Sequence, residues 1–485
     1  MSEKNITFGT SGHRGIIGEA FSAEHVTAIA WSIAEYLAKF DNPKIALGFD
    51  PRPGNSPNLE EGSFTKIICD VLISQGINVH VFSHFAATPL VSWYIRNYKM
   101  EGGLILTASH NPGIYNGIKF NPANGAPAPN NVTKAIEDIA NEHFGKGVPK
   151  AKSKIGTVTK INMDNAFARA LIKNIRNKSN LNSVDLSEVP VVVDAKHGTA
   201  ASLWKAIFHE LKINKFAIIN AEALPDFGGI EPNPTKLYTL GELKTRQKTF
   251  SAPIAIANDP DADRHVILNE KGDPVSPELI SVIILDYLVS QNANLKGIAS
   301  TVASSAIVKN AVEKNNLEYI ETAVGFKYFG EFLETADKEG KIGLAVESSG
   351  GFTASYHVFE KCGFMPCIFI LMILKATGKK LSELVMEMQE KYGVFYFLEE
   401  EYKFAPEKKR ELINLFKSIQ KEDIQKESED EIINLNKTDG VKINFADGWV
   451  LMRLSGTEPI ARIYAESEIE EKAKKYLELA KNILK

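Results

Sequence analysis

A hydroxyl and an imidazole stand side by side where a short aliphatic run ends. Residues 104–106 are Leu-Ile-Leu, the kind of run that fills a buried parallel strand, and they lead into a polar loop that carries Ser109 and His110. Lys119 follows within reach of this loop. A nucleophile at the carboxyl end of a strand, with a base and a cation nearby, indicates covalent catalysis on an anionic substrate. A surface turn rich in Ser, His, Asn and Pro has the same composition, so the loop alone leaves both interpretations open.

Three carboxylates alternate along a second loop, at Asp259, Asp261 and Asp263. On an extended loop they can converge on one hard cation and leave coordination positions open, which suits Mg²⁺ holding a phosphate oxygen. A calcium-binding loop is the rival, since Glu270 falls at the twelfth position of such a pattern. However, Arg264 occupies the position that requires glycine, and the flanks are typical of strands rather than helices. A solvated acidic turn is the other alternative.

A third set of residues is suited to binding phosphate and sugar. Two guanidinium groups, two hydroxyls and a glycine near the carboxyl end describe a phosphate cradle, supplied by Arg453, Ser455, Gly456, Thr457 and Arg462. In the glycine-rich stretch 8–15, Arg14 could clamp a phosphate or a carboxylate with its fork of donors. Glu347 and Ser349 form a short polar hook that suits sugar hydroxyls. The sequence contains no P-loop, dinucleotide fingerprint or zinc-ligand spacing.

Repeated β-α units must hold these loops. The first round predicts helices over about 22–40 and 59–75, and strands over 44–50 and 77–82, before the strand that leads to Ser109. The alternation restarts with strands over 189–194, 216–220 and 253–258, and again with strands over 297–300, 317–322 and 342–346. Each round ends in a polar loop at the carboxyl end of a strand, which is where open α/β sheets bind ligands. We therefore expect three similar domains that contribute one loop each.

The predicted fold class is α/β, with three similar βα domains whose sheets are mixed and mostly parallel, and a smaller α+β C-terminal domain, all around a central cleft. The C-terminal part changes character, with a strand at 448–452 and a closing amphipathic helix marked by apolar residues from Ile469 to Ile483. We expect the domains to span 1–150, 151–272, 273–385 and 386–485, so that each contains one of the polar loops.

Composition and charge are typical of a globular protein and argue against a nucleic-acid-binding or membrane-spanning one. With 485 residues, 44% of them hydrophobic and 24% charged, the chain is an ordinary globular one with room for several domains. A net charge of −4 gives no basic field of the kind that nucleic acid attracts, and the longest apolar stretches are far short of a membrane span. Cys69, Cys362 and Cys367 stand in no metal or redox spacing, which indicates a reducing compartment. Because the amino terminus also lacks the layout of a signal peptide, we expect a cytoplasmic protein without nucleic-acid or membrane partners.

Taken together, these motifs resemble the α-D-phosphohexomutase family, the phosphoglucomutases and phosphomannomutases. The resemblance runs from the amino-terminal loop to Arg462 and implies that Ser109 carries a phosphate. It also implies that Asp259, Asp261 and Asp263 bind Mg²⁺, with the phosphate on Ser109 as a further ligand. Glu347 and Ser349 match the residues that bind sugar hydroxyls, and the cradle matches the phosphate-binding loop of the fourth domain. Proton transfer and charge neutralisation around the phosphoserine are implied for Arg14, His110 and Lys119.

The substrate preference that the resemblance implies rests on a few positions. Thr322, Gly325 and Lys327 lie in a segment that is similar to the phosphoglucomutase form of this loop, which makes them expected substrate-binding residues. Thr107, where serine is usual in phosphoglucosamine mutases, weighs against that activity. Ser348 stands where the family usually has glutamate or methionine, and Cys362 stands where phosphoglucomutase-like members usually have aspartate. Mannose phosphates therefore stay open as alternative substrates.

The reaction that the resemblance implies moves a phosphoryl group between O1 and O6 of a hexose, from glucose 1-phosphate to glucose 6-phosphate in the expected case. Phosphorylated Ser109 donates to the free hydroxyl, and a hexose 1,6-bisphosphate is both the intermediate and the activator that restores enzyme lacking its phosphate. The expected partner is thus a hexose phosphate, with monomer and dimer both open. The alternatives are phosphomannomutase as the main activity, a phosphatase that uses the same serine and metal, and a non-catalytic sugar-phosphate-binding homologue.

Overall fold

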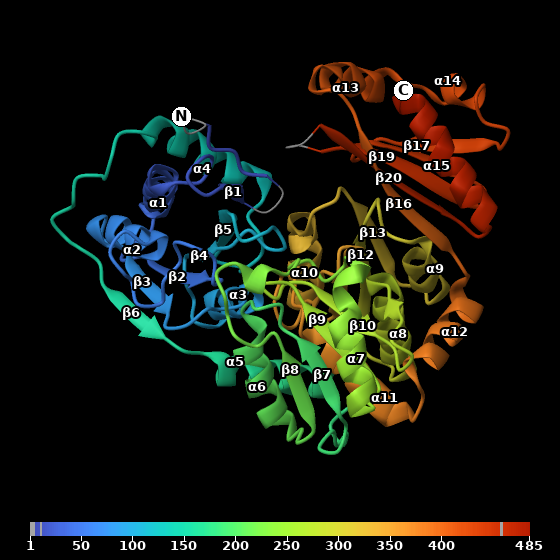
Figure 1. Ribbon diagram of the computed structural model, residues 1–485, viewed down its shortest axis with the longest axis horizontal. Helices are drawn as coiled ribbons and strands as arrows, with labels where there is room; N and C mark the ends of the chain where they lie inside the picture. Colours follow the sequence, from blue (N-terminus) through green and yellow to red (C-terminus); the bar gives the residue numbers. More distant parts are fainter. Residues whose placement is uncertain (1–4, 10–11, 456–458) are drawn as a thin grey trace.

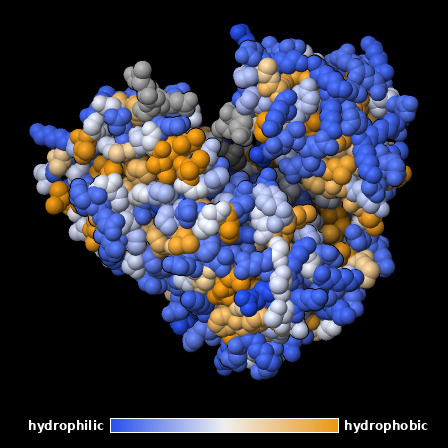
Figure 2. Space-filling model, in the orientation of Figure 1, coloured by the Kyte–Doolittle hydropathy of each residue, from blue (hydrophilic) through white to orange (hydrophobic). Residues whose placement is uncertain are grey.

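The computed structural model describes residues 5–9, 12–455 and 459–485, and these fold around four β-sheets (Figure 1). The first sheet and the fourth lie in two separate lobes, and the second and third sheets join the lobes from below in the view of Figure 1. The space-filling view shows that the surface is notched between the two lobes (Figure 2). None of the helices in these residues combines the length and the apolar character that crossing a bilayer would need.

The first sheet has six strands in the order β1-β5-β4-β2-β3-β6. In that order they are His13–Ile16, Tyr115–Pro122, Gly102–Leu106, Lys44–Phe49, Asn78–Phe82 and Val158–Ile161. β5 runs antiparallel to both β1 and β4, and the remaining pairs are parallel. Every residue of β4 is buried, because α1 (Ala23–Leu37), α2 (Phe64–Ser74) and α4 (Asn130–His143) pack on one face of the sheet and α3 (Thr88–Asn97) packs on the other.

The second and third sheets are smaller. The second has the order β11-β10-β9-β7-β8, with strands Pro274–Val275, His265–Leu268, Ala255–Asn258, Val191–Asp194 and Phe216–Ile219. Its helices are α5 (Asp164–Ser179), α6 (Ala200–Leu211) and α7 (Gly241–Phe250). The third has the order β13-β12-β14-β15, with strands Glu318–Thr322, Leu295–Thr301, Ile342–Val346 and Phe352–Ala354. Its helices are α8 (Pro277–Ser290), α9 (Ala306–Lys314), α10 (Gly330–Lys338), α11 (Met365–Thr377) and α12 (Leu381–Tyr392).

These three sheets share one strand order around their polar loops. The order is β5-β4-β2-β3 in the first, β10-β9-β7-β8 in the second and β15-β14-β12-β13 in the third. In each set the last three strands are parallel and the first runs antiparallel to its neighbour. Each polar loop therefore connects a buried parallel strand to the antiparallel strand beside it. The expectation of three similar α/β domains is confirmed.

The fourth sheet is antiparallel throughout, in the order β16-β20-β19-β18-β17. Its strands are Tyr396–Lys403, Ile460–Ser467, Gly448–Leu454, Val441–Phe445 and Ile432–Asn436. Helices α13 (Lys409–Ser418), α14 (Lys421–Gln425) and α15 (Glu470–Leu484) complete this α+β unit, and α15 lays its buried face on the sheet. The expected smaller C-terminal domain is thus present.

Several boundaries differ from the sequence expectations. Helix α2 begins at Phe64 rather than near residue 59, because Leu59 and Gly62 have positive φ angles of 56° and 78° and the side chain of Ser63 then caps the helix. Strand β6 and helices α4 and α5 are not among the expected elements. The domain boundaries stay a proposal: β6 lies beyond residue 150 yet joins the first sheet, and α12 spans the expected boundary after residue 385.

Candidate active site

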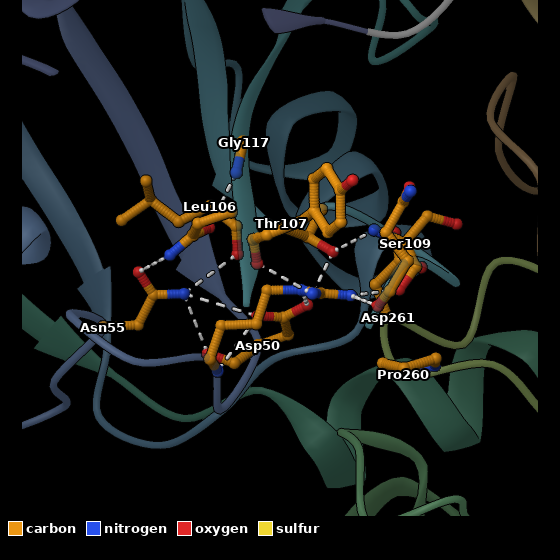
Figure 3. Close-up of polar contacts among 12 residues, drawn as sticks. Asp50, Asn55, Leu106, Thr107, Ser109, Gly117, Pro260 and Asp261 are labelled. Carbon is orange, nitrogen blue, oxygen red and sulfur yellow. Dashed lines mark hydrogen bonds and ion pairs between the residues drawn. The ribbon is translucent and has the colours of Figure 1, made fainter. Parts of the chain in front are cut away.

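The side chain of Ser109 is held in a strained turn directly after β4. Ser109 is 1% exposed and has a φ angle of 52°, which residues other than glycine rarely adopt. Its backbone N–H donates to the hydroxyl of Thr107 at 2.8 Å, and that hydroxyl donates to the Oδ2 atom of Asp50 at 2.7 Å. Figure 3 shows this chain of contacts from Asp50 through Thr107 to Ser109. The loop conformation is therefore set by side chains of the first sheet.

Arg52 fixes the backbone of the same loop. Its side chain is completely buried and donates to four carbonyl oxygens, those of Ser109 at 2.6 Å, Asn111 at 2.7 Å, Pro112 at 2.7 Å and Tyr115 at 2.8 Å. The charge of Arg52 is balanced by Asp50, whose Oδ2 atom lies 2.9 Å from its Nε atom. The fork of donors on one rigid guanidinium thus satisfies the carbonyls that the turn leaves without partners in the sheet.

The second loop brings the three aspartates against Ser109. Asp259, Asp261 and Asp263 are fully buried, and they offer ligand oxygens that all lie within 4.8 Å of one another. The hydroxyl of Ser109 donates to the Oδ2 atom of Asp259 at 2.8 Å. Burial and the two neighbouring carboxylates raise the pKa of Asp259 well above its ordinary value. A cation between the three side chains would remove this repulsion.

The donor set fits a hard divalent cation. All three groups supply oxygen, and the Oδ1 atoms of Asp261 and Asp263 are buried and find no hydrogen-bond partner among the residues that the structure describes. An oxygen in that state is costly unless an ion or a water reaches it. The flanks are the antiparallel strands β9 and β10 rather than two helices, which argues against the helix-loop-helix form of a calcium site.

Two lysines balance the aspartates from other parts of the chain. Lys119, on β5, donates to Asp261 at 2.6 Å and Asp263 at 3.0 Å, and the Nζ atom of Lys361 lies 3.1 Å from Asp263. Burial acts to lower the pKa of Lys119, but Asp261 and Asp263 outweigh it and hold that pKa above its ordinary value. Lys119 therefore stays protonated, and its contribution is a fixed positive charge.

His110 has the opposite electrostatic surroundings. The positive charge of Arg264, burial and the positive charge of Arg14 lower the pKa of His110 well below its ordinary value. Its ring is consequently neutral at pH 7. The Nη1 atom of Arg14 donates to the side chain of Asn111 at 3.2 Å, so this arginine lies against the Ser109 loop.

Hydrogen bonds connect the three polar loops and the start of α3 to one another. Thr88, at the start of α3, donates to Asp261 through its N–H at 2.9 Å and its hydroxyl at 2.7 Å. The N–H of His265 donates to the carbonyl of Gly350 at 3.0 Å, which ties the aspartate loop to the loop after β14. That third loop carries Glu347, which is 6% exposed, and Ser349, which is half-buried. The first three sheets thus bring their polar loops to one place.

The remaining predicted residues lie on the third and fourth sheets. Thr322 ends β13 and Gly325 has a φ angle of 139°, and half-buried Lys327 has its pKa lowered by burial. Arg453 and Arg462 face each other in register on β19 and β20, where Ser455 follows β19. Gly456 and Thr457 lie outside the described residues. The roles assigned to all these residues stay predictions.

Four side chains in the cluster were not singled out from the sequence for a role in the site. The sequence around Thr88 indicates only the start of a helix. Arg264 directly follows Asp263, the last of the three aspartates. Arg52 carried a detectable signal, because Asp50-Pro51-Arg52 ends the strand β2 that lies beside β4. Lys361 follows a loop of the third sheet, and nothing in its local sequence points to Asp263.

Comparisons with known proteins match most of the chain to one family. Its descriptions read phosphoglucomutase/phosphomannomutase, with alpha/beta/alpha domain I matching residues 5–145, domain II residues 169–272, domain III residues 276–392 and the C-terminal domain residues 406–481. A phosphoglucomutase/phosphomannomutase of Thermococcus kodakarensis is 30% identical over 98% of this chain and 98% of its own length. A phosphoglucomutase of Komagataeibacter xylinus is 26% identical over 96% of this chain and 88% of its own length. The crystal structure of a putative phosphomannomutase from Thermus thermophilus has the same fold, with a TM-score of 0.80 at 24% identity over 100% of both chains.

Proposed function

We propose an activity for this chain on the premise that it belongs to the phosphoglucomutase/phosphomannomutase family, which the four domain matches and the relative at 30% identity establish. The chain is a phosphohexomutase, an enzyme that relocates a phosphoryl group on a sugar phosphate. In the proposed reaction the group moves between O1 and O6 of a hexose, and glucose 1-phosphate and glucose 6-phosphate are the preferred pair. Mannose phosphates are secondary substrates in this proposal.

The observation that carries the proposal is the contact between Ser109 and Asp259. A buried hydroxyl in a strained turn, 2.8 Å from one of three converging carboxylates, is expensive to maintain without a chemical use. In the proposed cycle the Ser109 oxygen carries a phosphoryl group and gives it to the free hydroxyl of the bound sugar phosphate. The resulting 1,6-bisphosphate turns over in the site and returns its other phosphoryl group to Ser109. One P–O bond forms for each that breaks, and no net water is consumed.

We propose that Asp259, Asp261, Asp263 and the phosphoserine oxygens would hold Mg²⁺. When bound, Mg²⁺ supplies positive charge to the phosphoryl oxygens. Lys119 adds a second, permanent positive charge at the same place, since its ammonium group touches two of the aspartates. Arg14 approaches the loop from β1 with a guanidinium suited to phosphoryl oxygens. His110 is the proposed acceptor of the proton that the attacking hydroxyl releases.

The substrate is proposed to lie between the three-loop cluster and the fourth sheet. Glu347 and Ser349 would bind sugar hydroxyls, and Thr322, Gly325 and Lys327 would line the sugar from the third domain. Arg453, Ser455, Gly456, Thr457 and Arg462 would bind the phosphate that is not reacting. A solved structure of the same fold, N-acetylphosphoglucosamine mutase of Aspergillus fumigatus, holds glucose 1,6-bisphosphate, with a TM-score of 0.56 at 14% identity. That complex supports a bisphosphate as intermediate and activator here.

A coupled assay for conversion of glucose 1-phosphate to glucose 6-phosphate, with Mg²⁺ and a trace of glucose 1,6-bisphosphate, tests the proposal. We expect turnover by the natural chain, about one phosphate on Ser109 by peptide mass spectrometry, and no turnover by Ser109→Ala. Release of inorganic phosphate in place of glucose 6-phosphate would instead identify a phosphatase. Binding of sugar phosphate without either product would identify a non-catalytic homologue, and activity of Ser109→Ala would overturn the nucleophile assignment.

A further inference from the structure

One carboxylate oxygen joins the fourth sheet to the loop that follows β13. The Oδ2 atom of Asp439 accepts hydrogen bonds from the Nε atom of Arg453 at 2.8 Å and from the backbone N–H of Val324 at 3.0 Å, and the Nη2 atom of Arg453 forms an ion pair with it at 2.8 Å. Asp439 lies in the turn between β17 and β18, Arg453 is on β19, and Val324 lies within the 322–327 segment. Groups from two domains therefore meet at a single carboxylate oxygen.

We infer that Asp439 is a positioning residue that sets where Arg453 stands relative to the 322–327 segment. The inference rests on the proposed function, because it assumes that Arg453 binds the non-reacting phosphate. A long arginine side chain samples several rotamers, and a charge-assisted hydrogen bond together with an ion-pair contact to one carboxylate selects one of them. The same carboxylate holds the backbone of the sugar-binding segment. One side chain thus contacts both Arg453 and the loop proposed to bind the sugar.

The turn that carries Asp439 has little freedom of its own. Gly440 follows it with a φ angle of 88°, and a Cβ atom built on Gly440 would lie 2.1 Å from the carbonyl oxygen of Met452. The turn is therefore packed against the backbone of β19 immediately before Arg453. A carboxylate on a rigid turn is a better anchor for a guanidinium than one on a mobile loop, because less motion must be frozen when the contact forms.

Other contacts already hold the fourth sheet on the third domain. Glu321 accepts from the Nζ atom of Lys442 at 3.1 Å and from the side chain of Asn436 at 3.0 Å. An apolar cluster spans the same junction and consists of Val302, Ala303, Trp449, Leu451 and Tyr464. Because these contacts do not touch Arg453, the two domains keep their junction when Asp439 is changed. Glu321 therefore provides a control for the loss of polar contacts across the junction that do not involve Arg453.

The test compares the steady-state kinetics of Asp439→Ala, Asp439→Asn and Glu321→Ala with those of the natural chain, using glucose 1-phosphate. We expect Asp439→Ala to raise KM about tenfold with kcat largely unchanged, which is the signature of lost binding common to ground and transition states. Asp439→Asn keeps one acceptor oxygen and should raise KM less. Glu321→Ala should leave KM within about twofold, because Glu321 contacts Lys442 and Asn436 and not Arg453. A thermal melt of each variant confirms that it is folded.

A double-mutant cycle with Arg453→Ala separates positioning from a general loss of structure. If Asp439 acts chiefly through Arg453, the effects of Asp439→Ala and Arg453→Ala on KM are clearly less than additive, and only the contact with the Val324 N–H remains to be lost in the double variant. Additive effects, an unchanged or lowered KM for Asp439→Ala, or an equal effect of Glu321→Ala would each overturn the inference and leave the mutase reaction standing. An unchanged KM for Arg453→Ala would overturn the inference together with the proposed phosphate clamp. These KM measurements do not test the role of Ser109, which is tested separately by Ser109→Ala.

Discussion

At the scale of single residues, the nucleophile owes its position to side chains that never meet the substrate in the proposed reaction. Arg52 is completely buried and binds the carbonyl oxygens on both sides of the turn that carries Ser109. Because every residue type has a backbone carbonyl, the sequence of the loop does not show which residues accept hydrogen bonds from Arg52. The strain at Ser109 is maintained by this arrangement.

We predict that Arg52→Lys lowers kcat about 10- to 100-fold, because an ammonium group cannot reach all the carbonyl oxygens and a small displacement of a nucleophile has a large effect on rate. Steady-state kinetics and phosphate content at Ser109 measure it. Arg96→Lys is the matched control. Arg96 is also largely buried and binds the His357 carbonyl at 2.9 Å and Asp337 at 2.9 Å, away from the Ser109 loop. It should lose stability without a comparable loss of kcat, and a normal kcat for Arg52→Lys would refute the positioning role.

Removal of one proposed metal ligand should also lower kcat strongly. We predict that Asp261→Asn lowers kcat by orders of magnitude at saturating Mg²⁺ while the chain stays folded, because two carboxylates cannot satisfy the geometry of the ion. Titration of activity with Mg²⁺ measures the effect, and chelation of the natural enzyme should abolish turnover reversibly. Asp185→Asn changes an exposed aspartate and should leave turnover unchanged. Near-normal turnover of Asp261→Asn would mean that the loop is only an acidic turn.

At the scale of elements, a buried carboxyl in the first turn of α8 makes stability depend on pH. Glu278 is 4% exposed, and burial, together with the nearby Glu466 and Glu399, raises its pKa from 4.5 to about 7. A carboxyl with a raised folded-state pKa binds its proton more tightly in the folded than in the unfolded chain. The cost of ionising it is absent below pH 4.5, grows as the pH rises, and is complete above about pH 7.

We therefore predict that Glu278→Gln gains stability over the natural chain as the pH rises from 4.5 to about 7, by up to about 3 kcal/mol. Denaturant unfolding at a series of pH values measures the difference in unfolding free energy between the two chains. Glu242, in the first turn of α7, is exposed, and Glu242→Gln provides the control for replacing a carboxylate at the start of a helix. A difference for Glu278→Gln that does not change with pH would refute the assignment.

Some helices and strands could be predicted from the sequence, and some contacts between them could not. Strands β4, β9 and β14 were predictable because each is an apolar run that stops at a polar loop. A strand that is buried on both faces must consist almost entirely of apolar residues. Helix α5 was within reach of the sequence as well, because Phe167, Leu171 and Ile175 are four residues apart, which is the spacing of one buried helix face. The meeting of the loops followed from topology, but the contacts of Thr88 and Lys361 with the aspartates did not, because they depend on how the sheets pack on one another.

At the scale of the whole molecule, the proposed reaction needs the substrate in two opposite orientations between the three-loop cluster and the fourth sheet. Specificity must then rest on hydroxyls that are presented in both orientations. Glucose and mannose differ only in the orientation of the C2 hydroxyl, so discrimination requires a group that demands one orientation. Ser348 is half-buried. Its side chain is shorter than the glutamate or methionine that the family resemblance predicts at this position, so we expect more room around the sugar.

We accordingly predict a preference for glucose 1-phosphate over mannose 1-phosphate of about 10- to 200-fold or less in kcat/KM, rather than exclusion of mannose. Both substrates must be measured under one condition, with the same bisphosphate activator. Ser348→Met should sharpen the preference if the space beside Glu347 is what admits both sugars. A higher kcat/KM for mannose 1-phosphate would reverse the substrate assignment and leave the phosphoryl transfer unaffected.

The hairpin from β4 to β5 also limits how this chain can vary. Lys119 reaches the aspartates from one face of β5, while its neighbours Ile118 and Phe120 fill the apolar core on the other. Insertion or deletion of a single residue within β5, between Tyr115 and Lys119, would shift the pairing of Lys119 with Ile105 and change the parity of the strand, turning the lysine into the core and two hydrophobic side chains toward the carboxylates. Length variation among natural relatives is therefore expected to collect in the connections between elements, while this strand keeps a fixed number of residues.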